Sequence, residues 1–152
     1  MRLTVILFGL LISLPVFGDD EHVLLLTDQL TKSECSACHF AYPAAMLPKV
    51  SWTKIMGNLE NHFGEDASLD TQTTQDITKY LVAQAGDTAF WSAKFVRGLD
   101  NQNPPIRITE TTYWVGRHPG ISKEILPSGL AGLKSNCAVC HLSAASGYYE
   151  KN

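Results

Sequence analysis

The chain contains four cysteines, and all four lie in two copies of one short motif. The motifs have the pattern C-x-x-C-H and span residues 35–39 and 137–141. This pattern is the attachment signal of c-type haem, because two thiols three positions apart can each form a thioether to one porphyrin. The adjacent histidine then supplies an axial nitrogen to the iron. We therefore expect two covalently attached haems, with these residues in the sites: Cys35, Cys38, His39, Cys137, Cys140 and His141.

Three other interpretations of the cysteine pairs are weaker. A local disulfide or a thioredoxin-like redox motif is possible in an oxidising compartment, but the βαβ pattern of a thioredoxin fold is missing. Four cysteines could also bind zinc. However, the 98 residues from 39 to 136 separate the pairs too widely for a zinc ribbon. Zinc sites also do not require a histidine directly after each pair.

The first residues predict export. Arg2 gives a positive start, residues 3–14 are apolar without a charge, and Pro15 ends that stretch. Residues 16–18 place small or modest side chains before a cut at Asp19. This is the pattern of a secretory signal peptide, and the apolar run is too short for a membrane anchor. We expect residues 1–18 to be a cleaved signal peptide and the mature chain to be periplasmic.

Length and charge fit one small domain. Removal of residues 1–18 leaves 134 of the 152 residues, and no later segment is apolar enough to span a membrane. We expect residues 19–152 to form a soluble dihaem cytochrome c domain, with a haem 1 region at about 30–86 and a haem 2 region at about 105–152. The formal net charge is −3, and no basic patch suggests nucleic-acid binding.

Apolar periodicity predicts an all-α fold of small cytochrome c-like helices and long loops packed around the two haems. A helix is expected over residues 51–63, with Ser51 as its N-cap and Gly64 just beyond its end. A second helix is expected between Asp70 and Gly86. Shorter helical segments are expected around 90–96, 113–117 and 130–133, and nothing supports a sheet.

Two haems have four axial positions, and the motif histidines fill only two. The remaining candidates are His22, His62, His118, Met46 and Met56. We predict that His62 and His118 are the distal ligands, because each lies 23 positions from a motif histidine (39 to 62 and 118 to 141). His62 would lie at the end of the helix, beside its apolar face, and His118 follows the aromatic stretch 113–115.

The methionines stay open as alternative ligands. Met56 lies on the apolar face of the expected helix, where a role in the core is sufficient, and Met46 lies between two prolines. His22 stands near the start of the mature chain and is expected to be solvated.

Several longer stretches resemble the small dihaem cytochrome c family. They are residues 34–43, 62–70, 107–111 and 136–141, in the order of the family and across nearly the whole mature chain. The resemblance implies bis-histidine ligation of both irons, with His62 and His118 as distal ligands. Residues 116–119 depart from the family pattern, which more often has an acidic residue near the histidine. The sequence therefore does not name the hydrogen-bond partner of His118.

These features predict a low-potential electron carrier rather than an enzyme. An iron with two imidazole ligands has no free site for a substrate, and methionine ligation would raise its potential. The resemblance implies redox partners such as a monohaem c-type cytochrome or a membrane b-type cytochrome. The alternatives are a haem enzyme or gas-binding protein with one open iron, and an electron-transfer subunit of a larger complex.

Overall fold

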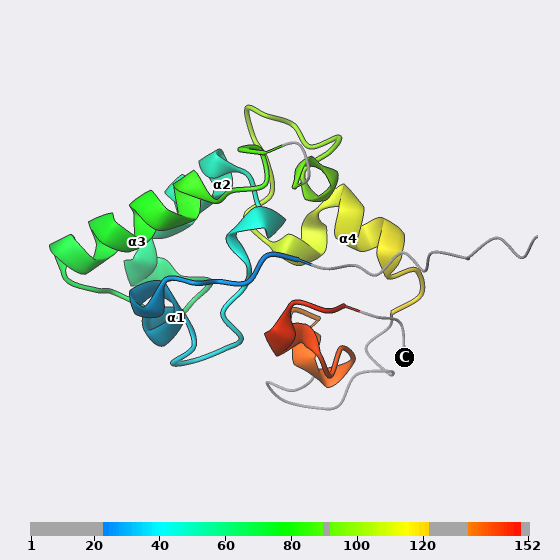
Figure 1. Ribbon diagram of the computed structural model, residues 1–152. Helices are drawn as coiled ribbons and strands as arrows, with labels where there is room; N and C mark the ends of the chain where they lie inside the picture. The colour runs from blue at the N-terminus through cyan, green and yellow to red at the C-terminus, as the bar shows by residue number, and fades with distance from the viewer. Residues whose placement is uncertain (1–22, 90–91, 122–133, 150–152) are drawn as a thin grey trace, which may run out of the picture.

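The structure is a computed structural model that describes residues 23–89, 92–121 and 134–149 (Figure 1). Within these ranges the chain forms short α-helices and 3-10 turns joined by long loops, and it contains no strand. The predicted all-α fold is therefore confirmed. The signal peptide, His22 and the segment expected to be helical at 130–133 lie outside the described residues. No helix within them is long and apolar enough to cross a membrane.

Three helices form the first half of the molecule. They are α1 (Gln29–Cys35), α2 (Lys49–Met56) and α3 (Thr71–Ala83), with the 3-10 turns η1 (Ala44–Met46) and η2 (Leu59–Asn61) beside α2. Aspartates cap two of them: the Asp28 carboxylate accepts the backbone N–H of Thr31, and that of Asp70 accepts the N–H of Thr73. Such caps satisfy N–H groups that have no partner inside the helix. The predicted helix after Asp70 is confirmed.

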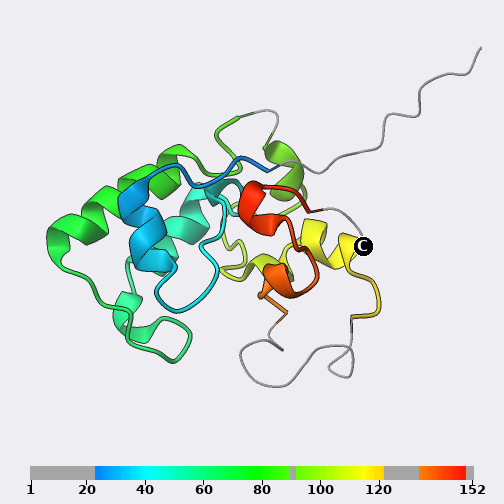
Figure 2. The ribbon, with the colours of Figure 1, turned by 60° about the horizontal axis from the view of Figure 1, so that its bottom comes forward.

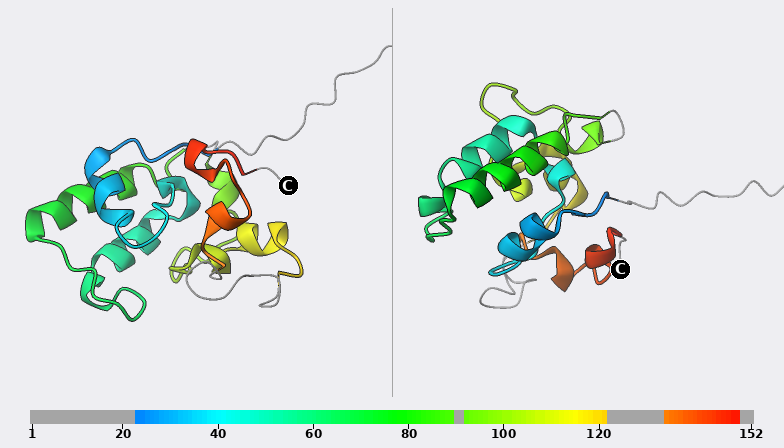
Figure 3. Two further views of the ribbon diagram at one scale, coloured as in Figure 1. Left: turned by 90° about the horizontal axis from the view of Figure 1, so that it is seen from below. Right: turned by 60° about the vertical axis from the view of Figure 1, so that its left-hand side comes forward.

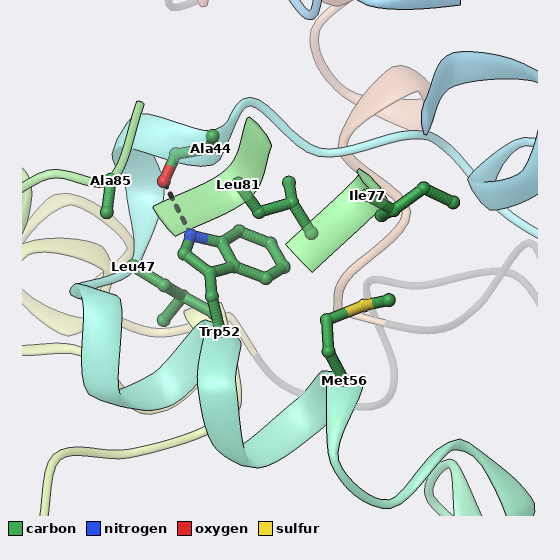
Figure 4. Close-up of a cluster of buried hydrophobic side chains, with 7 residues drawn as sticks. All are labelled: Ala44, Leu47, Trp52, Met56, Ile77, Leu81 and Ala85. Carbon is green, nitrogen blue, oxygen red and sulfur yellow. Dashed lines mark hydrogen bonds between the residues drawn. The ribbon is translucent and has the colours of Figure 1, made fainter. Parts of the chain in front are cut away.

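Helices α2 and α3 pack side by side and enclose the main hydrophobic core (Figures 3 and 4). Trp52 crosses the interface, and its indole N–H donates to the carbonyl oxygen of Ala44 at 2.7 Å. This bond lets the polar edge of the tryptophan be buried without a lost hydrogen bond. The buried members of the cluster are Ala44, Leu47, Trp52, Met56, Ile77, Leu81 and Ala85.

The predicted helix at 51–63 is wrong at both ends. Helix α2 begins at Lys49, directly after Pro48, because proline lacks the N–H that a first turn leaves unpaired. Ser51 lies inside the helix and is not its cap; its buried hydroxyl donates to the carbonyl oxygen of Pro105 at 2.7 Å. The helix ends at Met56, followed by Gly57. His62 consequently lies outside the helix, in the loop that follows.

The second half is built from shorter elements. These are η3 (Ala93–Phe95), η4 (Ile108–Glu110), α4 (Thr112–Arg117), η6 (Cys137–Val139) and η7 (Ala144–Ser146). Helix α4 confirms the helical segment predicted at 113–117. Figures 1 and 2 show η6 and η7, in orange and red, near α4. Neither α4 nor η6 has a buried residue of its own.

Several contacts join the two halves. The backbone N–H of Val23 donates to the carbonyl oxygen of Gly147 at 2.8 Å, so the first described residue pairs with the last loop. A second hydrophobic cluster joins Ala45 and Met46 of the first half to Phe95, which packs edge-on against Tyr113 with ring centroids 4.8 Å apart. The hydroxyl of Tyr42 donates to the carbonyl oxygen of Ser135 at 2.8 Å. This last bond connects the two cysteine motifs.

Candidate haem sites

The first site brings together residues that lie far apart in the sequence. Cys35 ends α1, and Cys38 and His39 follow in a turn. The ring of His39 lies near that of His62, with centroids 6.0 Å apart and planes only 14° from parallel. The first motif histidine and its predicted distal partner therefore form a pair of imidazoles with a gap between them.

A tight turn positions His62. The backbone N–H of His62 donates to the carbonyl oxygen of Glu65 at 2.7 Å, and the N–H of Glu65 donates back at 3.2 Å. Phe63 and Gly64 between them have φ values of +58° and +104°. Positive φ at both central positions is the requirement of a type I′ turn. Phe63 is the strained residue, since a side chain disfavours this region by about 1–3 kcal/mol.

An arginine covers this turn from the other half of the chain. The guanidinium of Arg107 lies over the Phe63 ring, 4.1 Å from its centroid, which is a cation–π contact. Burial lowers the pKa of His62, and the neighbouring His39 and Arg107 lower it further. His62 is therefore neutral at pH 7, the form in which an imidazole nitrogen binds a metal.

The ring of His39 is held by residues that follow it closely in the sequence. Its Nδ1 hydrogen-bonds the carbonyl oxygen of Phe40 at 2.7 Å, which leaves Nε2 for a metal. The ring of Tyr42 stacks on His39 at 5.1 Å with an interplanar angle of 24°. Because the Tyr42 hydroxyl also donates to Ser135, one side chain touches the first site and reaches the segment just before the second.

The second site pairs His118 with His141. His118 is the C-cap of α4, and His141 follows η6 and the second cysteine pair. Their ring centroids are 5.9 Å apart, nearly the same as in the first site, but their planes are 88° apart. The two sites therefore share a spacing and differ in ring orientation.

Trp114 supports His118 from one helical turn earlier. The indole stacks on the imidazole with centroids 4.3 Å apart and planes 11° apart. The carbonyl oxygen of Trp114 also accepts a hydrogen bond from His118 Nδ1 at 2.8 Å. This backbone oxygen is a hydrogen-bond partner of the His118 ring, and it leaves Nε2 of His118 for a metal.

The surroundings of His141 are apolar and aromatic. The ring of Tyr149 lies 5.5 Å from that of His141, and its buried hydroxyl has no hydrogen-bond partner among the described residues. Burial raises the pKa of Cys137 to about 11. The thiol is therefore uncharged at neutral pH, and a thioether at this position would be uncharged as well.

Comparison with known proteins identifies the chain. The profile of the family described as dihaem cytochrome c matches residues 31–149. The chain belongs to this family. No curated protein sequence matches it significantly.

Three solved structures are similar to this dihaem cytochrome. A diheme cytochrome c from Rhodobacter sphaeroides is 46% identical, with 83% of this chain and 99% of that chain covered and a TM-score of 0.76. A second Rhodobacter sphaeroides structure, of purified DHC, is 44% identical over 82% and 99% of the chains, with a TM-score of 0.67. The diheme cytochrome c sb-DHC from Shewanella baltica OS155 is 34% identical over 80% and 86%, with a TM-score of 0.63.

The dihaem cytochrome carries two c-type haems, and the geometry of both histidine pairs fits this cofactor. A metal–imidazole bond is about 2 Å long, so the centroids of two imidazoles on opposite sides of one iron lie about 6 Å apart. The observed separations are 6.0 and 5.9 Å. The cysteines of each motif are not joined in a disulfide. Within the described residues, no three histidine, cysteine or acidic side chains cluster to hold a bare metal ion, so the zinc interpretation has no support.

Met56 lies in the main core cluster, and Met46 in the second cluster.

Sequence reasoning did not identify the roles of three residues. Trp114 lies four positions before His118 on a helix, a spacing that could have suggested the stack. Tyr42 and Tyr149 were not identified: the ring contact of Tyr42 is with nearby His39 and that of Tyr149 with His141, and only the Ser135 carbonyl that accepts from Tyr42 lies far away in the sequence.

Proposed function

We propose that this dihaem cytochrome is an exported, low-potential electron carrier, in which His39 and His62 bind one iron and His118 and His141 bind the other. The observation that supports this assignment is the 6 Å spacing of both histidine pairs, 6.0 and 5.9 Å. Haem iron supplies reversible one-electron chemistry when bound. A protein that closes both axial positions of each iron restricts it to that chemistry.

The chain's own residues keep the ligands in place. Hydrogen bonds to the carbonyl oxygens of Phe40 and Trp114 fix the tautomers of His39 and His118. The turn at residues 62–65 and burial keep His62 neutral and oriented. Ligands that are already oriented and deprotonated need little rearrangement when the iron changes its oxidation state, which favours fast electron exchange.

A potentiometric titration tests the low potential. We expect both midpoints to lie below those of a cytochrome c with histidine and methionine ligands, because methionine raises the potential. Replacement of His118 by methionine should raise the midpoint of the second haem and leave the first nearly unchanged. A wild-type midpoint in the histidine–methionine range would contradict the proposal.

Carbon monoxide binding tests whether an iron is open. We expect the reduced protein not to bind carbon monoxide at neutral pH, whereas the His62→Gly and His118→Gly variants should each bind it at one haem. Binding by the wild-type protein would favour a haem enzyme or a gas-binding protein.

Electrons should pass between the two haems within one molecule. The proposal is supported by Tyr42, which stacks on His39 and donates to Ser135, two residues before Cys137. Mixing the fully reduced and fully oxidised proteins and following each haem separately would test it. Redistribution within a molecule should be faster than exchange between molecules and independent of protein concentration.

The proposed export rests on the pattern of residues 1–18, and the proposed partners rest on the family resemblance. Mass spectrometry of the protein from a periplasmic fraction should find a chain that begins at Asp19 and carries two haems. The partner would be a monohaem c-type cytochrome or a membrane b-type cytochrome. The net charge of −3 supports a basic docking face on it, so the rate of electron transfer between them should fall as salt is added.

A further inference from the structure

The two sites orient their imidazole rings differently, and this difference has an electronic consequence. The inference rests on the proposed bis-histidine ligation. An imidazole donates π-electron density into the iron d orbital that is perpendicular to its ring plane. When both rings are parallel, they act on the same d orbital and separate its energy from that of the other d orbital of π symmetry. When the rings are perpendicular, each acts on a different orbital and the two stay nearly equal in energy.

The observed angles place the sites at the two extremes. The planes of His39 and His62 are 14° apart, whereas those of His118 and His141 are 88° apart. Both angles occur at the same centroid spacing, so the difference comes from rotation of the rings. Side chains packed against a ligand set this rotation.

At the second site the residue that controls the rotation is Trp114. Its indole lies flat on His118 at 4.3 Å with planes 11° apart, and its carbonyl oxygen holds His118 Nδ1 at 2.8 Å. The hydrogen bond to the carbonyl oxygen fixes one edge of the imidazole, and the stacked indole fixes its face. His118 therefore cannot turn toward the plane of His141 without losing the stack.

We propose that the first haem has nearly parallel axial imidazoles and the second has perpendicular ones, and that Trp114 is the positioning residue that sets the second arrangement. The two haems are then electronically distinct although their ligands are identical. Each can be followed by its own paramagnetic signal during a redox titration.

Low-temperature electron paramagnetic resonance of the oxidised holoprotein tests the orientations. We expect two low-spin signals: a rhombic signal from the first haem, and a strongly anisotropic signal with one dominant low-field feature from the second. Two signals of the same type would overturn the proposed orientations and leave bis-histidine ligation intact. A high-spin signal in the wild-type protein would instead contradict the proposed function.

Variants of Trp114 test its role. Trp114→Leu keeps an apolar side chain but removes the flat ring, and it should shift the low-field feature toward the rhombic type without changing the first signal. Trp114→Phe keeps a flat ring and should restore most of the wild-type feature. Val115→Ala, at a neighbouring side chain that is 56% exposed on the same helix, is the matched control and should change neither signal.

Haem content is measured on every variant by mass spectrometry. A Trp114→Leu protein with two haems and an unchanged second signal would overturn the positioning role. A Trp114→Leu protein that lacks the second haem would also overturn it, because Trp114 would then serve haem retention rather than ring orientation.

Discussion

The two haem sites start from the same motif and the same 23-residue spacing, yet different structures complete them. At the first site a type I′ turn presents His62, and the aromatic stack lies on the motif histidine, where Tyr42 covers His39. At the second site the end of a helix presents His118, and the stack lies on this distal histidine, which Trp114 covers. The ring planes are consequently near-parallel at one site and perpendicular at the other.

The packing around the two sites also differs. The first site adjoins helices α2 and α3, beside a core of seven buried residues that includes Trp52. In the second half, α4 and η6 bury no residue of their own, and η7 buries only Ala144. The comparison teaches that a cysteine motif determines where a haem is attached, while nearby packing determines ring orientation and how much the fold depends on the cofactor.

The largest expected effect comes from removal of one haem at a time. Replacing Cys137 and Cys140 by alanine should abolish amide-exchange protection in residues 134–149 but leave helix α3 protected, because α3 has its own apolar core. The matched Cys35→Ala/Cys38→Ala variant removes the haem that adjoins this core, so it should lower the protection of α3. Mass spectrometry would verify one haem in each. Loss of α3 protection in the first variant would show that the main core is not independent.

Replacing a glycine by alanine should lower the stability of the protein in the first half and raise it in the second. A Cβ at buried Gly86 would overlap the carbonyl oxygen of Ala45 and lie 2.6 Å from Val96 Cγ1, so Gly86→Ala should destabilise by about 1–3 kcal/mol. A Cβ at Gly116 on α4 meets no atom within 4 Å, so Gly116→Ala should stabilise by about 0.5–1 kcal/mol.

Thermal or chemical unfolding of each holoprotein measures both changes. Destabilisation by Gly116→Ala would indicate that the space beside α4 is filled by a haem edge.

Removal of the Tyr42 hydroxyl should weaken the connection between the sites. Tyr42→Phe loses the bond to Ser135 but keeps the ring on His39, and we expect a loss of about 0.5–1.5 kcal/mol in unfolding free energy. The first electron paramagnetic signal should not change. Tyr80→Phe, which removes an exposed hydroxyl bonded to the Thr27 N–H within the first half, is the control and should cost less. Equal losses would contradict a special role for Tyr42.

The smallest effect is expected in acid. Hydrogen bonds from Thr31 and Thr73 lower the pKa values of Asp28 and Asp70, which cap α1 and α3, whereas α4 is capped by the hydroxyl of Thr111. Because the folded pKa values are depressed, the caps stabilise above the ordinary aspartate pKa of about 3.9, and this contribution is lost as the pH falls through the folded values.

Amide exchange measured down to about pH 3 should therefore show that α1 and α3 lose protection as their capping aspartates are protonated. The hydroxyl that caps α4 does not titrate, so α4 should not lose protection for this reason. Asp70→Asn keeps an acceptor that does not titrate, and it should remove the pH dependence from α3 only. A dependence that persists in this variant would mean that another group is responsible.

Periodicity predicted the helix after Asp70 because a capping aspartate and an apolar face act within one segment; the helix ends at Ala83, before the expected Gly86. The helix at 51–63 was predicted with wrong ends for the opposite reason. Ser51 resembles a cap, but a carbonyl 54 residues away, that of Pro105, takes its hydroxyl. His62 was selected as a ligand on a helix, and the structure places it in a turn that a cation–π contact from Arg107 covers.

The sequence by itself determined the two cysteine motifs, the all-α fold and the four candidate histidines, since each depends on residue type and short-range spacing. The tertiary structure alone decided the separation and angle within each histidine pair, the stacking of Tyr42 and the backbone partner of His118. These depend on rotations about single bonds and on contacts between distant segments. Side-chain packing fixes both, and one-dimensional spacing does not encode them.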